Sequence, residues 1–449
     1  MAVAQNRVRI LQADQLIGAG EDKRILRGNV LLQTDDFIMS CDSAYHHQRI
    51  EKLEAFGNIE ITTDDEKIWA DYVLHNLRTE FSEFRGRVIL KNPEATIFSE
   101  MVDYDHIDDR ATFPQYLRLE DENGILVAES GIYYNKADSA VFRGAVQVAD
   151  STQYAEADSL FTNRRARYYE LHGRVFLKDL ERNAIMQGRY VEADSAGFRR
   201  IDENAIMIRI EENEERVDTS YVWSHQMLIW EEDTTYRFQA YGDVHIWSER
   251  SQSLADSTFY DDAIEKFTLL GELPKAWFRE LQLSGPTIHI QMKDEEIESI
   301  LSYERPFSVQ RDTITQRLHQ ITGDTIFVSF VDGDLDYVRV LKYPELFYHT
   351  KDEDDQPDGA IELKTNRYII MFFEDGEMTK GRAKDSSSGI FHPENEDTKN
   401  KRLEGFIYTP ELRPEKPEFR MQPFLPEIPE DRPIDLPPRY LRFISEQSN

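Results

Sequence analysis

The sequence has one cysteine among 449 residues, and no run of apolar residues long enough to cross a membrane as a helix. The single cysteine, Cys41, excludes an internal disulfide framework and a cysteine-based metal site. Basic residues are also scarce, since 53 lysines and arginines stand against 85 acids, for a net charge of -32. This balance excludes a nucleic-acid binder, which needs a basic face, and simple docking on anionic lipid headgroups. Excess surface acid favours solubility, with a high-salt habitat as the alternative explanation.

Motifs of the common enzyme classes are missing too, since there is no GxSxG, HExxH, P-loop or dinucleotide fingerprint. Asp332, Asp334 and Asp336 alternate as in some calcium loops, but an Asp-Gly pair is also a strong hairpin signal. His46 and His47 lie near a predicted turn, without a third ligand close in sequence. We therefore predict no enzyme, no cofactor and no metal site.

What the sequence does have is a repeat of about 29 residues, marked by glycine. Aliphatic residues stand two and four positions after each glycine up to Gly242, and these are Ile206 and Ile208 in the unit where asparagine replaces glycine. A small residue and then an acid stand 13 and 14 positions after most of the glycines. The slots of the repeat are Gly28, Gly57, Gly86, Gln115, Gly144, Gly173, Asn204, Gly242 and Gly271.

Within each unit the apolar residues alternate with a period of two, which predicts β-strands with one buried face. Glycine inside a strand marks a bend or a bulge, and polar turns such as residues 63–66 separate successive strands. No unit can bury its apolar face alone, so the units must stack. We predict an elongated all-β architecture in which two sheets close on one apolar interior.

The recurring acids, among them Asp42, Asp71, Asp158 and Asp256, raise the question of a catalytic carboxylate pair. The same acid recurs in nearly every unit, however, and a single active site does not need that. We interpret these acids as structural groups that support turns or strand edges. Cys41 occupies an inward small-residue position, and we interpret it as a core residue.

From about residue 301 the register of the repeat is lost. Residues 325–340 and 368–383 resemble each other, since each has an apolar run, an acid-glycine turn and a shorter strand. The proline-rich stretch from Pro410 to Pro438 favours an extended, poorly packed tail with a frayed end. We divide the chain into residues 5–300, a more irregular β segment at 301–384, and a polar, proline-rich extended tail at 385–449.

The first residues read MAVAQ, and Ala2-Val3-Ala4 resembles the end of an A-x-A signal-peptidase site. We therefore expect an exported protein whose signal peptide has been removed, with Gln5 as the mature start.

The segments GNVLL, CDSAY, WADYVL and FRGRVIL resemble the OstA-like, or LptA, family of lipopolysaccharide-transport proteins. The signature of that family is a G-x-V-x-L strand followed by an A-D-x-x-x-aromatic strand. The resemblance covers at least residues 24–285, and 320–383 looks like a further segment of the same type. It implies a fold, an open and V-shaped β-jelly roll with unpaired edge strands at both ends.

The same resemblance implies a periplasmic bridge that carries lipopolysaccharide to the outer membrane. The acyl chains of lipid A would lie in the apolar groove, and edge strands would join the chain to other bridge proteins or head-to-tail to itself. Two features depart from the family, because this chain is much longer than the compact form and is strongly acidic for a carrier of a phosphorylated glycolipid. Arg85 and Arg87 are local cations that could meet phosphate.

The residues that we expect to line the groove are inward aliphatic residues of the repeat. Two rival interpretations remain: a structural or adhesive β-solenoid with a closed interior, and a polysaccharide-active β-helix enzyme, which would need clustered acids. The groove candidates are Val30, Leu32, Met39, Ile59, Ile61, Ile68, Val88, Leu90, Ile97, Leu126, Val146 and Val148.

Overall fold

The computed structural model describes residues 8–20, 22–34, 37–64, 66–212, 217–232, 235–293 and 296–428. The predicted signal-peptidase site and the last residues of the predicted tail lie outside these ranges. Almost all regular structure in the described part is β-strand, which confirms the predicted all-β fold. None of the helices in these ranges has the length and apolar character needed to cross a membrane.

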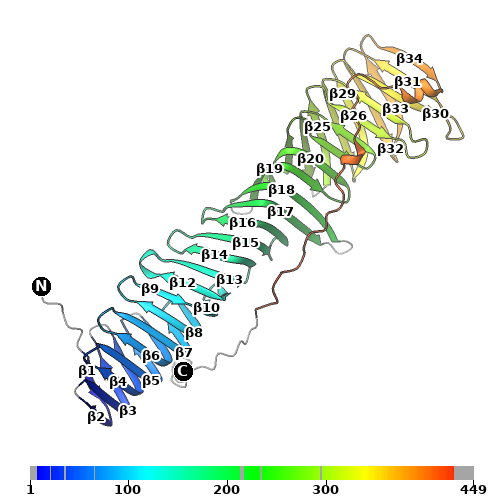
Figure 1. Cartoon of the computed structure of the whole chain (residues 1–449). Helices are drawn as coiled ribbons and strands as arrows, with labels where there is room; N and C mark the ends of the chain where they lie inside the picture. The colour runs from blue at the N-terminus through cyan, green and yellow to red at the C-terminus, as the bar shows by residue number, and fades with distance from the viewer. Residues whose placement is uncertain are drawn as a thin grey trace. The chain divides into compact units, whose positions relative to one another are not determined.

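The chain forms two units, which Figure 1 shows coloured along the sequence. The first unit holds residues 1–182, 189–195 and 421–449, and the second holds 183–188 and 196–420. The strands up to residue 193 are β1 (Arg9–Gln12), β2 (Gln15–Ala19), β3 (Lys23–Gln33), β4 (Ile38–His47), β5 (Lys52–Thr62), β6 (Lys67–Asn76), β7 (Phe81–Lys91), β8 (Ala95–Asp105), β9 (Arg110–Phe113), β10 (Leu117–Asp121), β11 (Gly124–Ala128), β12 (Ser130–Tyr134), β13 (Ser139–Asp150), β14 (Gln153–Asn163), β15 (Tyr168–Asp179) and β16 (Ala184–Ala193).

The second unit continues the series with shorter strands toward its end. These are β17 (Phe198–Glu212), β18 (Val217–Glu232), β19 (Thr235–Trp247), β20 (Ser251–Asp261), β21 (Lys266–Leu270), β22 (Lys275–Phe278), β23 (Leu281–Ser284), β24 (Thr287–Lys293), β25 (Glu296–Tyr303), β26 (Phe307–Arg311), β27 (Leu318–Thr322), β28 (Thr325–Val331), β29 (Asp334–Leu341), β30 (Glu345–Lys351), β31 (Pro357–Lys364), β32 (Tyr368–Glu374), β33 (Glu377–Lys384) and β34 (Ser388–Pro393). A single turn of α-helix, α1 (Glu396–Asn400), follows them.

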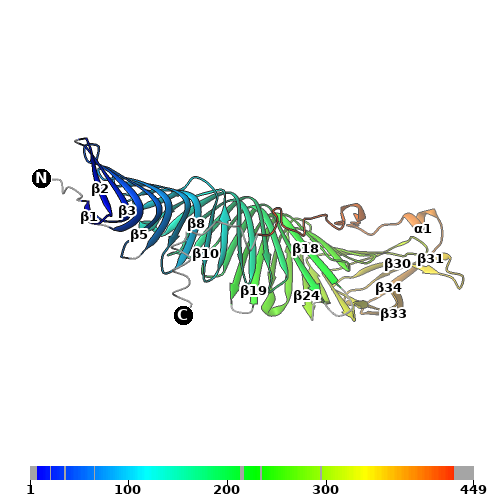
Figure 2. The same ribbon diagram turned by 90° about the horizontal axis from the view of Figure 1, so that it is seen from below.

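The long strands that contain a repeat glycine turn a corner there. In the first unit, where the strands follow one another as curved ribs (Figure 2), the β5–β6 ladder pairs Phe56 with Tyr72 and then shifts register to pair Ile59 with Ala70. Gly57 has a φ of +73°, in the left-handed region that favours glycine. The bulge bends the strand, so its two halves belong to two different walls.

The recurring acids are part of these corners, which confirms their structural interpretation. A Cβ built on Gly57 would lie 2.5 Å from Asp42 Oδ2, because the carboxylate lies directly over the glycine. Asn58 Nδ2 donates a hydrogen bond of 2.8 Å to the same oxygen. The next corner, at Gly86, repeats the arrangement. Asp71 lies over Gly86, and Arg87 Nε donates a hydrogen bond of 2.9 Å to Asp71 Oδ2.

At two positions of the repeat another residue replaces glycine, and the corner differs from the glycine corners. At the slot of Gln115 the strand is broken, since β9 ends at Phe113 and β10 begins at Leu117. Near residue 204 the corner has a positive φ at both Glu203 and Asn204, so the corner begins one residue earlier than predicted. A shift of one residue exchanges the two faces of a strand. Ile206 and Ile208 therefore lie on the opposite face of their strand from the aliphatic residues at the matching positions of the other units.

The inward residues of β17 are those that alternate with Ile206 and Ile208 along the strand. Met207 lines the same interior cavity as its cross-strand partner Val222. Ile208 pairs with Tyr221, whose ring contacts Phe419 of the C-terminal segment on the opposite face.

The two predicted acid-glycine hairpins are confirmed in the second unit. Asp332 and Gly333 join β28 to β29, and Asp375 and Gly376 join β32 to β33, all with positive φ. The β structure continues beyond residue 384, because β34 pairs with β31 as far as Pro393.

Candidate functional site

The first unit has a continuous row of aliphatic side chains along one wall, which we call the aliphatic row. Consecutive members are direct cross-strand partners from β3 to β13. Eight of the twelve predicted groove residues belong to it, together with Leu119. The aliphatic row consists of Leu32, Met39, Ile61, Ile68, Leu90, Ile97, Leu119, Leu126 and Val148.

The other four predicted residues lie deeper, next to the corners. Val30, Ile59, Val88 and Val146 are at most 1% exposed. Their cross-strand partners are small, namely Cys41, Ala70, Ser99 and Ala157. Large residues thus meet small ones where the two walls converge, and Cys41 is a core residue, as we interpreted it. Exposure varies along the aliphatic row, from 0% at Leu32 and 1% at Met39 to 8% at Leu90 and Leu126.

The opposite wall carries a second row, which we call the facing row and which mixes polar and apolar side chains. It too runs through direct cross-strand partners. Its members are His46, Leu53, His75, Ser82, Tyr104, Ala111, Tyr133, Ala140, Thr162 and Tyr169. The polar members were not predicted as site residues, although they share the parity of inward Leu53.

The two rows meet across a cavity of about 280 Å³ in the first unit. Ile61 and Ile68 line it from the aliphatic row, and Ser82 and Tyr104 line it from the facing row. Phe37 closes against His75, with ring centroids 5.5 Å apart. The cavity is therefore amphipathic, with one apolar wall and one wall of hydrogen-bonding groups.

Hydrogen bonds order the polar wall of this cavity. Ser82 Oγ lies 2.9 Å from both His75 Nδ1 and His106 Nε2. Tyr104 donates its hydroxyl to Asp109 Oδ1 at 2.6 Å, and Asn135 Nδ2 donates to the Tyr104 oxygen at 2.8 Å.

His75 and Tyr104 are neutral near pH 7. Burial lowers the pKa of His75 to about 4, and repulsion from His106 acts in the same direction. Burial and then the bond to Asp109 raise the pKa of Tyr104 above its ordinary value. Ser82 and Tyr104 therefore offer neutral hydrogen-bonding groups to the cavity, and the acids Glu66 and Asp109 line it as well.

The second unit has a larger cavity between its walls, of about 450 Å³. This volume falls in the range of small-molecule binding sites, roughly 300 to 1,000 Å³. Phe238, Ile246, Phe267, Met292 and Ile297 are among the apolar residues that line it. Arg209 and Arg250 line it as well, and Arg250 forms an ion pair with Glu296, another lining residue. The described lining thus combines apolar side chains with two arginines and six acids.

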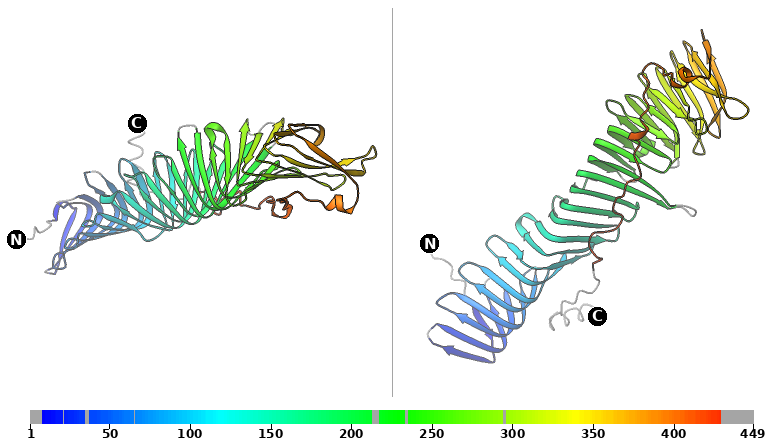
Figure 3. Two further views of the ribbon diagram at one scale, coloured as in Figure 1. Left: turned by 90° about the horizontal axis from the view of Figure 1, so that it is seen from above. Right: turned by 45° about the vertical axis from the view of Figure 1, so that its right-hand side comes forward.

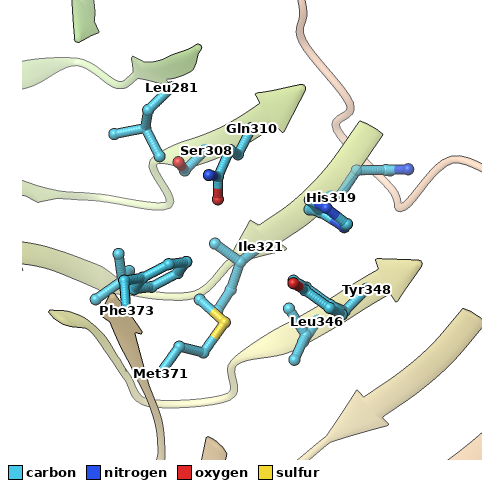
Figure 4. Close-up of a pocket in the computed structure, with 11 residues that line it drawn as sticks. Leu281, Ser308, Gln310, His319, Ile321, Leu346, Tyr348, Met371 and Phe373 are labelled. Atoms are coloured by element: carbon cyan, nitrogen blue, oxygen red, sulfur yellow. The ribbon is translucent and has the colours of Figure 1, made fainter. Parts of the chain in front are cut away.

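Further along the second unit the interior is nearly filled. Figure 4 shows side chains of β23, β26, β27, β30 and β32 converging on a cavity of only about 20 Å³, the space of one water molecule. His319 stacks on Tyr348 there, with ring centroids 4.0 Å apart. Buried Asp312 accepts hydrogen bonds from the backbone N–H groups of Ile314 and Thr315, at 2.8 and 2.7 Å. The pKa of Asp312 is held well below its usual range, chiefly by its hydrogen bond with the His319 side chain.

Two of the residues considered as metal ligands have structural roles. Asp332 forms the β28–β29 turn, and Asp334 pairs with Arg279. His47 Nε2 lies 3.7 Å from Glu54 Oε2. Within the described ranges, no group of three or more histidine, cysteine or acidic side chains is placed to hold a metal ion.

The two arginines considered for phosphate are engaged by acids. Arg85 Nη1 donates to Asp103 Oδ1 at 2.7 Å, and Arg87 bonds to Asp71 at a corner. A phosphate would have to compete with these carboxylates.

The C-terminal segment packs against the outer face of the strands, contrary to the predicted poor packing. Figure 3 shows it running beside the strands of the second unit. Its residues 401–420 contact that unit, where Leu403, Phe406 and Tyr408 pack with buried Val309 and Phe347. The segment is extended as predicted, since most of it forms no helix or strand.

Buried glutamines on the outer face hold the backbone of this segment. Gln320 Oε1 accepts from Leu403 N at 2.9 Å, and Gln282 Oε1 accepts from Thr409 N at 2.9 Å. Gln187 Nε2 donates to Arg420 O at 2.6 Å. Sequence reasoning missed these contacts, and the signal it overlooked is a neutral, long polar residue at outward positions of successive strands.

Comparisons with known proteins agree with the repeat pattern. Residues 5–158 match the family described as OstA-like protein. No curated protein matches the chain in sequence. A similar solved structure is LptH from Pseudomonas aeruginosa, described as the LptA homologous periplasmic component of the conserved lipopolysaccharide transport device. It is 14% identical, covers 22% of this chain and 76% of its own, and has a TM-score of 0.21. Residues 5–158 of this chain are therefore similar to the OstA-like protein family.

Proposed function

We propose that this protein is a periplasmic lipopolysaccharide-binding bridge that shields lipid A acyl chains in its apolar groove on the way to the outer membrane. The observation that carries the proposal is the aliphatic row, which runs without interruption over nine cross-strand positions in the region that matches the family. An acyl chain needs such a continuous surface, because any polar interruption would cost free energy of desolvation. In this role the protein carries its ligand without transforming it.

The facing row suits the other half of such a ligand. A glycolipid has sugar hydroxyls beside its acyl chains, and neutral donors and acceptors such as Tyr104 and Ser82 can bond to them.

Edge strands provide the means of bridging. At the N-terminal end, β2 exposes Leu16 and Ile17, at 61% and 42%. At the other end, β34 exposes Ile390 and Phe391, each at 55%. An exposed strand edge with apolar side chains is a template for β-augmentation. We propose that these edges join the chain to other transport proteins or head-to-tail to a second copy.

A structural β-solenoid without lipid is the competing function. The near-complete burial of the deep residues favours it, since Val88 and Val146 are 0% exposed. The two functions differ in whether the walls separate to admit a ligand.

The test is native mass spectrometry with lipid extraction on protein purified from a Gram-negative host. We expect bound lipopolysaccharide in the unmodified chain, and its loss in Ile61→Asp and Leu90→Asp, which place a charge in the aliphatic row. Arg78→Asp, at an exposed turn, is the matched control and should retain the lipid. Circular dichroism checks that each variant folds. A folded, lipid-free protein that also fails to take up added lipopolysaccharide would support the structural solenoid.

A further inference from the structure

The two walls of the second unit separate at β20. Residues 251–254 of this strand pair with β22, and residues 257–261 pair with β21. From there each wall continues through its own series of paired strands. We call one the β22 wall, which continues through β23, β26, β27 and β30, and the other the β21 wall, which continues through β24, β25, β28 and β29.

Turns at the far ends of the two walls face each other over the cavity of about 450 Å³, and we call this side the mouth. On the β22 wall the turns lie at residues 248–250 and 279–280. On the β21 wall, Glu296 begins β25, and Gly333 lies in the turn between β28 and β29. Arg250, Glu296 and Gly333 all line the cavity, so the mouth lies directly over it.

Ion pairs of one polarity join the two walls at the mouth. Arg250 of the β22 wall pairs with Glu296 of the β21 wall, and Arg279 pairs with Asp334 in the same direction. The Arg250 guanidinium also lies over the β28–β29 turn, because a Cβ built on Gly333 would lie 2.8 Å from Arg250 Nη1. Both turns of the β22 wall are therefore fastened to the β21 wall through charge.

These two pairs are contacts that can open readily. Their four side chains are between 44% and 62% exposed. Ion pairs between exposed side chains contribute little stability, and salt screens them. A third pair between the walls is held more firmly, since Lys351, which lies 2.9 Å from Glu377, is only 15% exposed and also contacts buried Asp312 at 3.1 Å.

We propose that the Arg250–Glu296 and Arg279–Asp334 pairs form a gate, through which the lipid enters the cavity of the second unit sideways across the mouth. This inference rests on the proposed lipid-carrying function. The described strands of the two walls form separate ladders after β20, so the walls can part at the mouth without breaking a ladder.

The surface behind the gate suits an acyl chain. Phe267 and Ile297 line the cavity, and Phe278 of the β22 wall meets Phe330 of the β21 wall with ring centroids 4.3 Å apart. Opening the mouth would expose these rings to water. An acyl chain that enters would cover them again, so the ligand itself offsets the cost of opening.

The test links the gate chemically and follows lipid uptake. Arg250→Cys and Glu296→Cys are combined in a Cys41→Ala background of the full chain, and a short bis-maleimide joins the two thiols. The matched control is the same chain with both thiols capped by N-ethylmaleimide, which removes the same charges and leaves the walls unlinked. Native mass spectrometry at timed intervals measures the uptake of added lipopolysaccharide and verifies that the link lies within one chain. We expect uptake by the linked chain to be slower by roughly tenfold or more.

A charge-reversal series tests the gate without a linker. Glu296→Lys places a second cation beside Arg250, and we expect uptake about three times faster than in the unmodified chain. Adding Arg250→Glu restores an ion pair of opposite polarity, and the rate should return to that of the unmodified chain. This series decides the question if the linked chain fails to fold.

The outcomes separate the gate from the proposed function. Equal uptake by the linked and the capped chain, or an unchanged rate in Glu296→Lys, would overturn the gate and leave lipid binding intact. A folded, unmodified chain that takes up no lipopolysaccharide would overturn the proposed function, and the gate with it.

Discussion

Replacing a corner glycine by alanine tests the account of how the repeat folds. In Gly57→Ala the new Cβ would lie 2.5 Å from Asp42 Oδ2 and 3.2 Å from Asp42 Cβ, at a φ of +73°. The left-handed conformation costs a non-glycine residue about 1 to 2 kcal/mol. Displacing the carboxylate also breaks its bond with Asn58, worth about 1 kcal/mol. We therefore expect a local destabilisation of about 2 to 3 kcal/mol.

The assay is hydrogen–deuterium exchange of peptides from β4 to β6, because a repeat protein can open locally without global unfolding. About 2 to 3 kcal/mol corresponds to exchange that is roughly 30 to 150 times faster in these strands. Gly18→Ala is the matched control, since a Cβ there meets no atom within 4 Å. If the two variants exchanged alike, the corner would not depend on glycine and the explanation of the repeat would fail.

Two further predictions concern the outer face and the polar wall. Gln282→Leu leaves the buried N–H groups of Thr409 and Trp277 without their acceptor. The loss destabilises the contact by about 1 to 3 kcal/mol for each group. Hydrogen–deuterium exchange in residues 401–413 should therefore rise at least tenfold, and it should not change in the exposed control Gln12→Leu. The lowered pKa of His75 means that only the unfolded state binds its proton between pH 6.5 and about 4, so stability falls as the pH drops through this window. The loss from pH 6.5 to pH 5 is about 1.5 kcal/mol; His75→Gln should flatten this part of the profile in local exchange measurements on β6 and β7, and an unchanged slope would contradict the assignment.

Much of the groove wall could be predicted from the sequence because strand periodicity and the glycine register act together. Once Gly28 and Gly57 are aligned, alternation alone decides that Leu32 and Ile61 share a face with Leu90. The acids were predicted to be structural because they recur, and the structure adds the reason, since each lies over the glycine of the following corner. The same logic failed at Asn204, where the pair of residues with positive φ begins one position earlier, at Glu203.

Contacts between segments far apart in the chain could not be predicted in this way. Proline content correctly indicated an extended C-terminal segment, but composition does not specify what such a segment packs against. The contact of Gln282 with Thr409 depends on outward residues, whose pattern carries no hydrophobic signal. Polar groups such as His75 and Tyr104 were overlooked for a related reason, because the search for a groove followed only the aliphatic residues.

Photo-crosslinking of added lipopolysaccharide to the second unit's cavity tests the central claim most directly. Ile297 lines this cavity, and its neighbour Glu298 is exposed on the other face of β25. A benzophenone amino acid is placed at each position in turn in the purified full chain. The account predicts a lipopolysaccharide adduct from position 297 and none from position 298. Equal labelling at both positions, or no adduct at 297 in a folded protein, would contradict a lipid-carrying groove.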